Sequence, residues 1–393
     1  MEKKTILLGI TGGIAAYKMA HVASSLTKMG HEVHVVMTES AQKFISPVTF
    51  RAITGLPVET DLFTEPNKNE VKHIALADKS DLVMVAPATA NMIGKIASGI
   101  ADDLLSTILT AVTSPVIIAP AMNVNMYNNE IVQDNIQYLE DKGYQLINPS
   151  EGMLACGYTG KGRLPEPDIL VEYILKALTK KDLSGKKILV TAGPTREGID
   201  PVRYITNHSS GKMGYAMAKR ASYRGAEVKL IAGPNDLEVP LTVDFERINS
   251  AEDLYNSVMA DYTNYDIIVM AAAVADFTPE NLAEDKIKKH TEDYFVLELK
   301  RTKDILEQIS TTKKENQTII GFAAESRNLV ENAKAKMEKK DMDMVVANDI
   351  KNKDIFGSDE SEVIIITEDT QIDVSRSSKE EIADKIYDLL LEK

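Results

Sequence analysis

TILLGITGG, residues 5–13, decides the fold class at the start of the chain. An almost wholly apolar run leads directly into a glycine-rich turn, and a helical pattern follows over 14–29. A short apolar run without polar alternation is typical of a strand that is covered on both faces. Its connection through glycine to a helix predicts the first strand and crossover of a parallel α/β sheet.

The same alternation continues along both halves of the chain. In the first half it predicts strands at 5–10, 32–38, 81–86, 115–120 and 144–148, with helices at 14–29, 90–112, 128–142 and 167–178. In the second half it predicts strands at 187–191, 227–232, 265–272, 318–322 and 344–347, then an antiparallel hairpin of 362–367 and 371–374. Strand–helix–strand repetition implies parallel sheets with right-handed crossovers.

We therefore predict two domains, 1–183 and 184–393, separated at the charged stretch KKDLSGKK (180–187). The first is a flavodoxin-like or Rossmann-like α/β domain with a parallel sheet. The second is another Rossmann-like α/β domain that ends in the β-hairpin. One large sheet is the alternative, but a complete second set of strands and helices after a charged break favours two domains.

Composition narrows the classes of partner. The 393 residues carry 45 Lys and Arg against 59 Asp and Glu, a formal charge of −14, which argues against nucleic-acid and membrane-surface binding. A single cysteine excludes an intramolecular disulfide and any multi-cysteine metal site. No run approaches roughly 18 apolar residues, so we predict a soluble, cytoplasmic protein with small-molecule partners.

The glycine-rich turn is the first candidate binding element. Gly12 and Gly13 let backbone N–H groups approach an anion at the start of a helix. The spacing departs from the dinucleotide fingerprint, and the second strand ends in Thr38 and Ser40 rather than an acid. These hydroxyls suit a phosphate or ribityl chain. A purely structural tight turn is the alternative.

Two further strand ends are unusual for plain connectors. APATAN (86–91) and APAMNVNM (119–126) combine small residues, proline and amides. Small residues let a flat ring approach, and Asn123 can bind the polar edge of such a ring. Asn123 could instead simply cap the following turn. Two such loops on one sheet edge favour a pocket.

His73 and Cys156 are the candidate acid–base groups of the first half. His73 stands in VKHIAL at a predicted helix start, where a lone histidine is usually solvated or capping. Cys156 lies among glycines in GMLACGYTGKGR (152–163), with Lys and Arg nearby, which predicts a flap whose thiol exchanges a proton.

These motifs together resemble the flavin-containing cysteine decarboxylases, and most of all phosphopantothenoylcysteine decarboxylases. The resemblance implies FMN as the cofactor, His73 as the base, Asn123 as the holder of the substrate carboxylate and Cys156 as the acid. It also implies trimeric flavin domains. The FMN positions it implies are Gly12, Gly13, Ile14, Thr38, Ser40, Ala88, Thr89, Asn91 and Met122. The family usually has Trp where this chain has Tyr127, a conservative change.

The second half opens with TAGPTREGIDPVRYITNHSSGKMG (191–214), a polar segment too long for an ordinary connection. Its hydroxyls and N–H groups precede a predicted helix and suit an anionic substrate. A polar capping segment is the alternative. The candidate substrate residues are Arg203, Asn207, His208, Ser209 and Ser210.

Cationic residues follow later strands of the second half. AAAVADF (271–277) precedes KIKK (286–289), and KDIL (303–306), GFAAE (321–325), Lys336 and Lys340 come further on. Lysines beside a nucleotide-binding loop bind phosphates as point charges, although a charge run is more often a solvated face.

This second set resembles phosphopantothenate–cysteine ligases, whose bacterial members use CTP and Mg²⁺. The resemblance implies an acyl-cytidylate, with Lys286 assisting nucleotide attack and Asn207 handling that intermediate. Magnesium is then held mainly through nucleotide phosphates. The nucleotide positions it implies are Ala271, Ala272, Ala273, Asp276, Lys286, Lys303, Asp304, Ile305, Leu306, Phe322, Lys336 and Lys340. Gly198 stands where many members have proline, which we expect to loosen the loop. The residues leave CTP and ATP equally suitable.

The two resemblances together imply a bifunctional enzyme of coenzyme A synthesis. Its C-terminal ligase acts first, and its N-terminal decarboxylase acts on the product. The resemblance also implies dimeric ligase domains and a dodecameric homo-oligomer. Two alternatives remain at this point: a nicotinamide-dependent oxidoreductase that uses the glycine turns, and a non-catalytic flavin-binding regulatory subunit.

Overall fold

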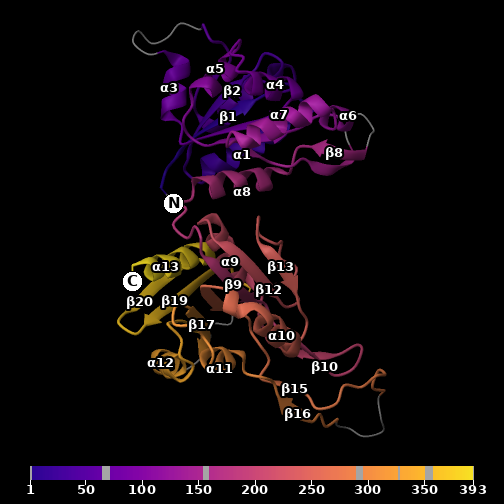
Figure 1. Ribbon diagram of the computed structural model, residues 1–393, viewed down its shortest axis with the longest axis vertical. Helices are drawn as coiled ribbons and strands as arrows, with labels where there is room; N and C mark the ends of the chain where they lie inside the picture. Colours follow the sequence, from indigo (N-terminus) through magenta and orange to yellow (C-terminus); the bar gives the residue numbers. More distant parts are fainter. Residues whose placement is uncertain are drawn as a thin grey trace. The chain divides into compact units, whose positions relative to one another are not determined.

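The computed structural model describes residues 2–63, 71–153, 159–288, 295–325, 328–349 and 357–392. The chain forms two compact units, residues 1–179 and 180–393 (Figure 1). Each unit is a sheet flanked by helices, which confirms the predicted α/β class. The predicted boundary at 183/184 falls just inside the second unit.

The first unit is built on a wholly parallel sheet of order β3-β2-β1-β4-β5-β6. Its strands are β1 (Thr5–Ile10), β2 (Glu32–Met37), β3 (Val58–Glu59), β4 (Leu82–Ala88), β5 (Val116–Pro120), β6 (Gln145–Leu146) and the antiparallel ribbon β7 (Ser150–Met153) with β8 (Thr159–Arg163). Its helices are η1 (Ile14–Tyr17), α1 (Lys18–Lys28), η2 (Ala41–Lys43), α2 (Pro47–Thr54), α3 (Lys72–Lys79), α4 (Ala90–Ser98), α5 (Leu104–Ala111), α6 (Val124–Tyr127), α7 (Glu130–Asp141) and α8 (Pro167–Leu178).

The predicted helix over 90–112 is wrong in one respect, since it is two helices. Gly99 ends α4 in the left-handed conformation, with φ 67°. Asp103 then starts α5 with a capping box, in which its side chain accepts from the Ser106 amide at 2.8 Å. A glycine stop followed by an acidic cap is a helix boundary that the apolar spacing concealed.

The second unit repeats this arrangement and extends it. Its sheet has the order β13-β12-β9-β14-β17-β18-β19-β20, parallel up to β18 and antiparallel beyond. The main strands are β9 (Lys187–Ala192), β12 (Glu227–Ala232), β13 (Asp244–Arg247), β14 (Ile267–Met270), β17 (Thr318–Glu325), β18 (Met344–Asp349), β19 (Glu360–Thr367) and β20 (Gln371–Ser378). The last two confirm the predicted hairpin.

Two small ribbons and several helices complete the second unit. The antiparallel ribbons pair β10 (Arg196–Gly198) with β11 (Tyr204–Thr206), and β15 (Phe277–Pro279) with β16 (Leu299–Arg301). The helices are α9 (Lys212–Tyr223), α10 (Ala251–Asp261), η3 (Tyr262–Asn264), α11 (Ile305–Ser310), α12 (Leu329–Lys339) and α13 (Lys379–Leu391). Among the described residues, every helix is too short or too polar to cross a lipid bilayer.

Both sheets reverse their strand order beside a central strand. In the first unit the chain moves outward from β1 to β3 on one side and then returns to build β4 to β6 on the other. In the second unit the same reversal separates β9 from β14. Loops at such a point leave the sheet in opposite directions, and the crevice between them is where ligands bind in open α/β sheets.

The core strands carry the apolar residues that the pattern predicted. Leu7 and Leu8 of β1 and Val83 of β4 are fully buried, as are Val190 of β9 and Val269 of β14. Each such side chain stabilises the fold by about 1.5–3 kcal/mol relative to an exposed position. The sheets therefore hold the loops at their carboxyl ends on a rigid base.

Arg224 is a polar anchor of the second unit. Its side chain is 6% exposed, and its guanidinium binds both carboxylate oxygens of Asp182, at 2.8 and 2.9 Å. It also contacts Asp388 of α13 at 2.8 Å. One arginine thus fastens the segment before β9 to the last helix.

We predict that Arg224→Met lowers the unfolding free energy by about 2–4 kcal/mol, because Asp182 keeps its partly buried charge with only the exposed Lys180, at 3.8 Å, as an ion-pair partner. Arg376→Met is the matched control. Its pair with Glu360 is largely exposed, at 74% and 52%, and should cost less than about 1 kcal/mol. Calorimetry of the second unit's transition measures both, and equal losses would contradict the anchoring role.

Candidate active sites

A cavity of about 610 Å³ lies at the reversal point of the first sheet. The loops after β1, β4 and β5 line it together with the end of β8. The predicted site residues among its lining are Gly12, Gly13, Ile14, Thr89, Met122 and Asn123. The three sequence motifs therefore converge on one cavity.

Gly12 is required by a close approach of two loops. A Cβ atom at Gly12 would stand 2.4 Å from the Cβ of Ser40, so any side chain would push the loops apart. The amide of Thr38 donates to the carbonyl of Ile10 at 3.1 Å, which holds the same two loops together. Thr38 and Ser40 thus stand beside the glycine turn but outside the residues that line the cavity.

Thr11 joins the two strand ends that flank the cavity. Its hydroxyl donates to the carbonyl of Pro87 at 2.5 Å and accepts from the amide of Thr89 at 3.1 Å. Thr11 is 2% exposed, so these bonds are made out of water. The sequence analysis missed this residue, since its partners lie far along the chain and nothing local distinguishes it from other threonines.

The end of β8 covers another side of the cavity. Gly162 accepts from the amide of Met122 at 3.0 Å, and a Cβ at Gly162 would stand 2.3 Å from the Met122 carbonyl. Lys18 holds the residues just beyond. Its buried ammonium donates to the carbonyl of Leu164 at 3.0 Å and to Glu166 at 2.9 Å. Lys18 also lines the cavity and was missed by the sequence analysis.

Asn123 caps a helix and also lies in the cavity wall. It is the N-cap of α6, with its side-chain oxygen accepting from the Asn125 amide at 2.8 Å. It also lines the cavity. The cap fixes the direction of the side chain, which is the condition for orienting a bound ligand.

The remaining predicted residues of the first half lie outside this cavity. Ala88 is buried, and its carbonyl accepts from the Ala121 amide at 3.0 Å, while Asn91 is exposed on α4. His73 is half-buried in the first turn of α3. Figure 1 shows α3 at the opposite end of the unit from α6 and β8. Cys156 lies outside the described residues.

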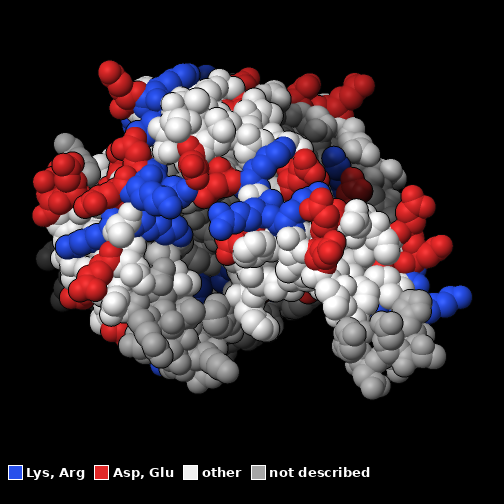
Figure 2. All heavy atoms as spheres, turned by 90° about the horizontal axis from the view of Figure 1, so that it is seen from below, with Lys and Arg blue, Asp and Glu red and all other residues white. Residues whose placement is uncertain are grey.

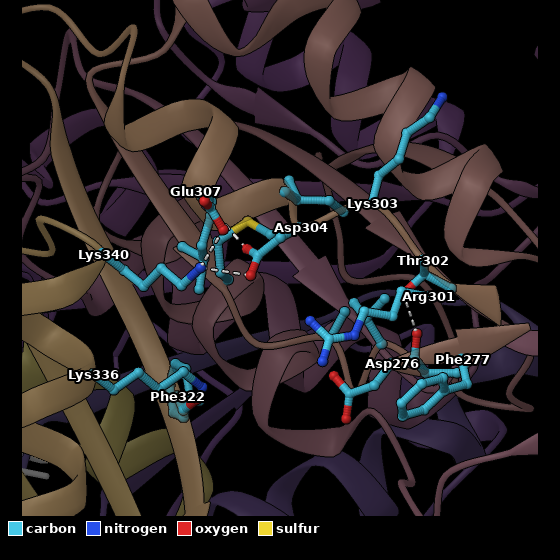
Figure 3. A pocket seen from close by; sticks show the side chains of 16 residues that line it. Asp276, Phe277, Arg301, Thr302, Lys303, Asp304, Glu307, Phe322, Lys336 and Lys340 are labelled. Carbon is cyan, nitrogen blue, oxygen red and sulfur yellow. Dashed lines mark hydrogen bonds and ion pairs between the residues drawn. The ribbon is translucent and has the colours of Figure 1, made fainter.

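The second unit has a cavity of about 620 Å³ beside its own reversal point. The loop after β14, the end of β16, the start of α11 and one face of α12 line it (Figure 3). Most of the predicted nucleotide positions are among the lining residues: Ala272, Asp276, Lys303, Asp304, Ile305, Leu306, Phe322, Lys336 and Lys340. Arg301 and Glu307 also line it and were missed.

Lys340 forms a charged network within this cavity. Its ammonium lies 2.6 Å from Asp304 and 2.9 Å from Glu307 (Figure 3). Burial opposes the charge on Asp304, but the hydrogen bonds from Lys340 and from the Glu307 amide outweigh it and hold the pKa of Asp304 below its usual value. Burial likewise disfavours the Lys340 ammonium, yet the two carboxylates keep the pKa of that lysine raised.

Asn207 contacts the loop that enters this cavity. Its side-chain nitrogen donates to the carbonyl of Ala273 at 3.3 Å and to that of Val274 at 3.0 Å. Ala273 is further fixed by its amide, which donates to the Gly193 carbonyl at 2.9 Å. Neither Ala273 nor Ala271 lines the cavity, so they contribute loop geometry.

Asp200 fastens together two segments that each carry a predicted residue. Its carboxylate is fully buried and accepts from the amides of Val202 and Arg203, both at 2.8 Å, and from the amide of Ile287 at 3.1 Å. Arg203 donates in turn to the Ile287 carbonyl at 3.1 Å. The Arg203 loop and the segment next to Lys286 are therefore held side by side.

The other predicted substrate residues precede α9. His208, Ser209 and Ser210 lead into its left-handed N-cap, Gly211, and the Ser209 hydroxyl accepts from the Gly211 amide at 3.4 Å. Lys286 is exposed. Neither these residues nor Lys286 line the second cavity, so the structure does not bring them together with the nucleotide positions.

The charges on one face of the molecule are mixed. On the face in Figure 2, Lys and Arg side chains are interspersed with Asp and Glu. Alternating charges cancel at longer range, whereas surfaces that bind nucleic acid present a basic stripe. In the described part of the chain, no cluster of three or more His, Cys, Asp or Glu side chains could hold a metal ion.

Each of the two α/β units is matched by a family model of its own. Residues 1–179 match the family model described as Flavoprotein, and residues 183–393 match the DNA/pantothenate metabolism flavoprotein C-terminal domain. The chain belongs to the family of coenzyme A biosynthesis bifunctional proteins, CoaBC.

The relatives share nearly the whole chain. The CoaBC protein of Bacillus subtilis is 47% identical, over 98% of this chain and 97% of its own length. That of Escherichia coli is 40% identical, over 88% of this chain and 86% of its own. A crystal structure of a CoaBC C-terminal domain is 40% identical and covers 54% of this chain and 96% of its own, with a TM-score of 0.46. The family predicted from the motifs is confirmed.

We predict that Thr11→Val lowers the stability of the first unit by about 1–3 kcal/mol, because the Thr89 amide loses its buried acceptor while the side-chain shape is kept. Thr110→Val is the control, since the Thr110 hydroxyl is exposed and should matter by less than about 0.5 kcal/mol. Thermal unfolding of the first unit measures both. Equal midpoints for wild type and Thr11→Val would refute the linking role.

For Asp200→Asn we predict faster amide hydrogen exchange in peptides that contain Val202, Arg203 and Ile287. The increase should be roughly tenfold or more, since hydrogen bonds to a charged acceptor are lost. Asp236→Asn, an exposed acid on another loop, should leave those peptides unchanged. Mass spectrometry reads both variants, and unaltered exchange in Asp200→Asn would mean that the carboxylate does not join the segments.

Proposed function

We propose that the chain carries out two consecutive steps of coenzyme A biosynthesis. The second unit joins 4′-phosphopantothenate to L-cysteine, and the first unit decarboxylates the product to 4′-phosphopantetheine. The observation that supports this most strongly is the pair of separate cavities, each lined by one of the two motif sets. Membership of a bifunctional family supports it as well.

FMN is the proposed group of the first cavity, and the residues present fit it. Gly12 and Gly13 bring bare backbone to one wall, where N–H groups suit a phosphate. Ile14 and Met122 offer apolar contact for a flat ring, and Thr89 a hydroxyl. When bound, FMN would supply a reversible two-electron acceptor for the cysteine side chain, whose oxidation makes loss of CO₂ possible without net redox change.

Asn123 is proposed to hold the substrate carboxylate. Its capping bond leaves the side chain in one orientation at the cavity wall, so its amide can direct the carboxylate without losing further freedom. Cys156 is the proposed acid, and this role rests on the family resemblance. His73 is the proposed base, since histidine exchanges protons near neutral pH.

His73 requires a second copy of the chain in this proposal. Within one unit, α3 lies at the opposite end from α6 and β8 (Figure 1). A site that uses both His73 and Asn123 therefore combines residues of two subunits. This supports the predicted trimer of flavin domains, while the dimeric ligase domains, the dodecamer and the cytoplasmic location remain predictions from the sequence.

The second cavity is proposed to take a nucleoside triphosphate with Mg²⁺. The pantothenate carboxylate attacks the α-phosphorus and releases diphosphate; the cysteine amine then attacks the acyl carbon and releases the nucleoside monophosphate. Asp304 and Glu307 are engaged by Lys340. Asp276 is the acid of this cavity for which the described residues provide no ion-pair partner, consistent with magnesium held mainly by phosphates. CTP is the proposed nucleotide, by resemblance.

The ligase activity is tested by incubating the full chain with phosphopantothenate, cysteine, Mg²⁺ and either CTP or ATP. Mass analysis should detect phosphopantothenoylcysteine, diphosphate and CMP with CTP, followed by phosphopantetheine. Absence of both the cysteine adduct and phosphopantetheine with either nucleotide would refute the ligase half. A chain that is colourless and takes up no FMN would refute the decarboxylase half.

We predict that His73→Asn and Lys286→Gln separate the two activities. His73→Asn should slow CO₂ release roughly 100-fold or more, the usual contribution of an acid–base group, with diphosphate release unchanged. Lys286→Gln should do the reverse, because it removes the positive charge proposed to assist nucleotide attack. Thermal unfolding of the substituted unit, compared with wild type, is the folding control for each variant. Loss of both activities in either variant would contradict the assignment to separate sites.

A further inference from the structure

Two basic residues of the second cavity, Arg301 and Lys303, flank Thr302 in the sequence. Only Lys303 was among the nucleotide positions implied by the sequence. Thr302 fixes the backbone between them, because its amide donates to the Asp276 carbonyl at 3.0 Å and its hydroxyl to the Ala275 carbonyl at 2.7 Å. The backbone that carries the two basic side chains is therefore held in place.

Lys303 is turned toward α10 and away from the other labelled side chains (Figure 3). Its ammonium lies 3.5 Å from Glu252 and 4.6 Å from the ring centre of Tyr255, both on α10. An ion pair and a cation–π contact hold it there. The backbone of residues 303–306, and not the charge of Lys303, is thus what this part of the motif contributes to the cavity.

The two lysines of α12 are also engaged. Lys340 is held by Asp304 and Glu307, and Lys336 donates to the Phe322 carbonyl at 3.2 Å. Among the cations that line the cavity, Arg301 is the one for which the described structure gives neither an ion pair nor a side-chain hydrogen bond. It is exposed at the end of β16.

Figure 3 shows the Arg301 guanidinium on the cavity side of the ribbon, facing the carboxylate of Asp276. No ion pair joins these two described side chains, so the guanidinium keeps its donors for a ligand. A guanidinium binds phosphate oxygens through two parallel N–H bonds, which a lysine cannot do. We propose that Arg301, rather than Lys303, is the residue that contacts the phosphates of the bound nucleoside triphosphate.

This inference rests on the proposed ligase function and assigns it a specific phosphate contact. The test is calorimetric binding of CTP, and separately of inorganic tripolyphosphate, to the full chain with Mg²⁺. Arg301→Gln should weaken both ligands roughly 10- to 100-fold, the loss expected for charge-assisted hydrogen bonds. Arg301→Lys, which keeps the charge without the fork, should fall between this variant and wild type.

Lys300→Gln is the matched control. Lys300 is the preceding residue of β16, and its ammonium lies 3.4 Å from the Glu280 carbonyl, outside the residues that line the cavity. It should bind both ligands as wild type does. Thermal unfolding of the second unit, measured in every variant, shows that the substituted unit is folded.

The outcomes separate failure of the Arg301 contact from failure of the ligase function. Wild-type affinity in Arg301→Gln, or an equal loss in Lys300→Gln, would overturn the role of Arg301 and leave the ligase function standing. A wild-type chain that binds neither CTP nor tripolyphosphate would overturn both. A larger loss for CTP than for tripolyphosphate would place Arg301 against the nucleoside and so overturn the phosphate contact.

Discussion

Parallel pairing on both sides of a central strand is the constraint on which both units depend. β1 pairs with β2 and β4, and β9 pairs with β12 and β14. The loops after neighbouring strands turn toward opposite faces of the sheet. A crevice therefore forms between them at the carboxyl ends of the strands. Each unit then links the two strand ends across that crevice in its own way. The first uses the hydroxyl of Thr11, and the second uses the hydrogen bond from the Ala273 amide to the Gly193 carbonyl.

Much of the fold could be predicted because its central strands are buried on both faces. Such strands read as continuous apolar runs, and their order along the chain implies the parallel sheet. The short edge strand β3 was missed, as were the ribbons that pair β7 with β8 and β15 with β16. Their pairing depends on what the neighbouring chain presents to them, and two or three residues carry no periodicity of their own.

The sites were predictable as sets of residues but not as directions of side chains. The motifs identified most of the lining of both cavities, since residues at the carboxyl ends of parallel strands must converge. They could not show that Lys303 turns toward α10, or that α3, which carries His73, lies at the opposite end of the unit from α6, which Asn123 caps. Thr11 and Lys18 have no local signature either, because their partners lie 76 to 148 residues away.

The network of Lys340, Asp304 and Glu307 has a consequence for how the second cavity distinguishes its ligands. Because two carboxylates already neutralise the Lys340 ammonium, its electrostatic attraction for a small inorganic anion is weak. A polyphosphate must exchange places with those carboxylates, and only a ligand with several negative charges and a metal ion compensates for that exchange. Lys340 therefore adds little to the binding of small anions, and its charge becomes available only to a ligand with several negative charges.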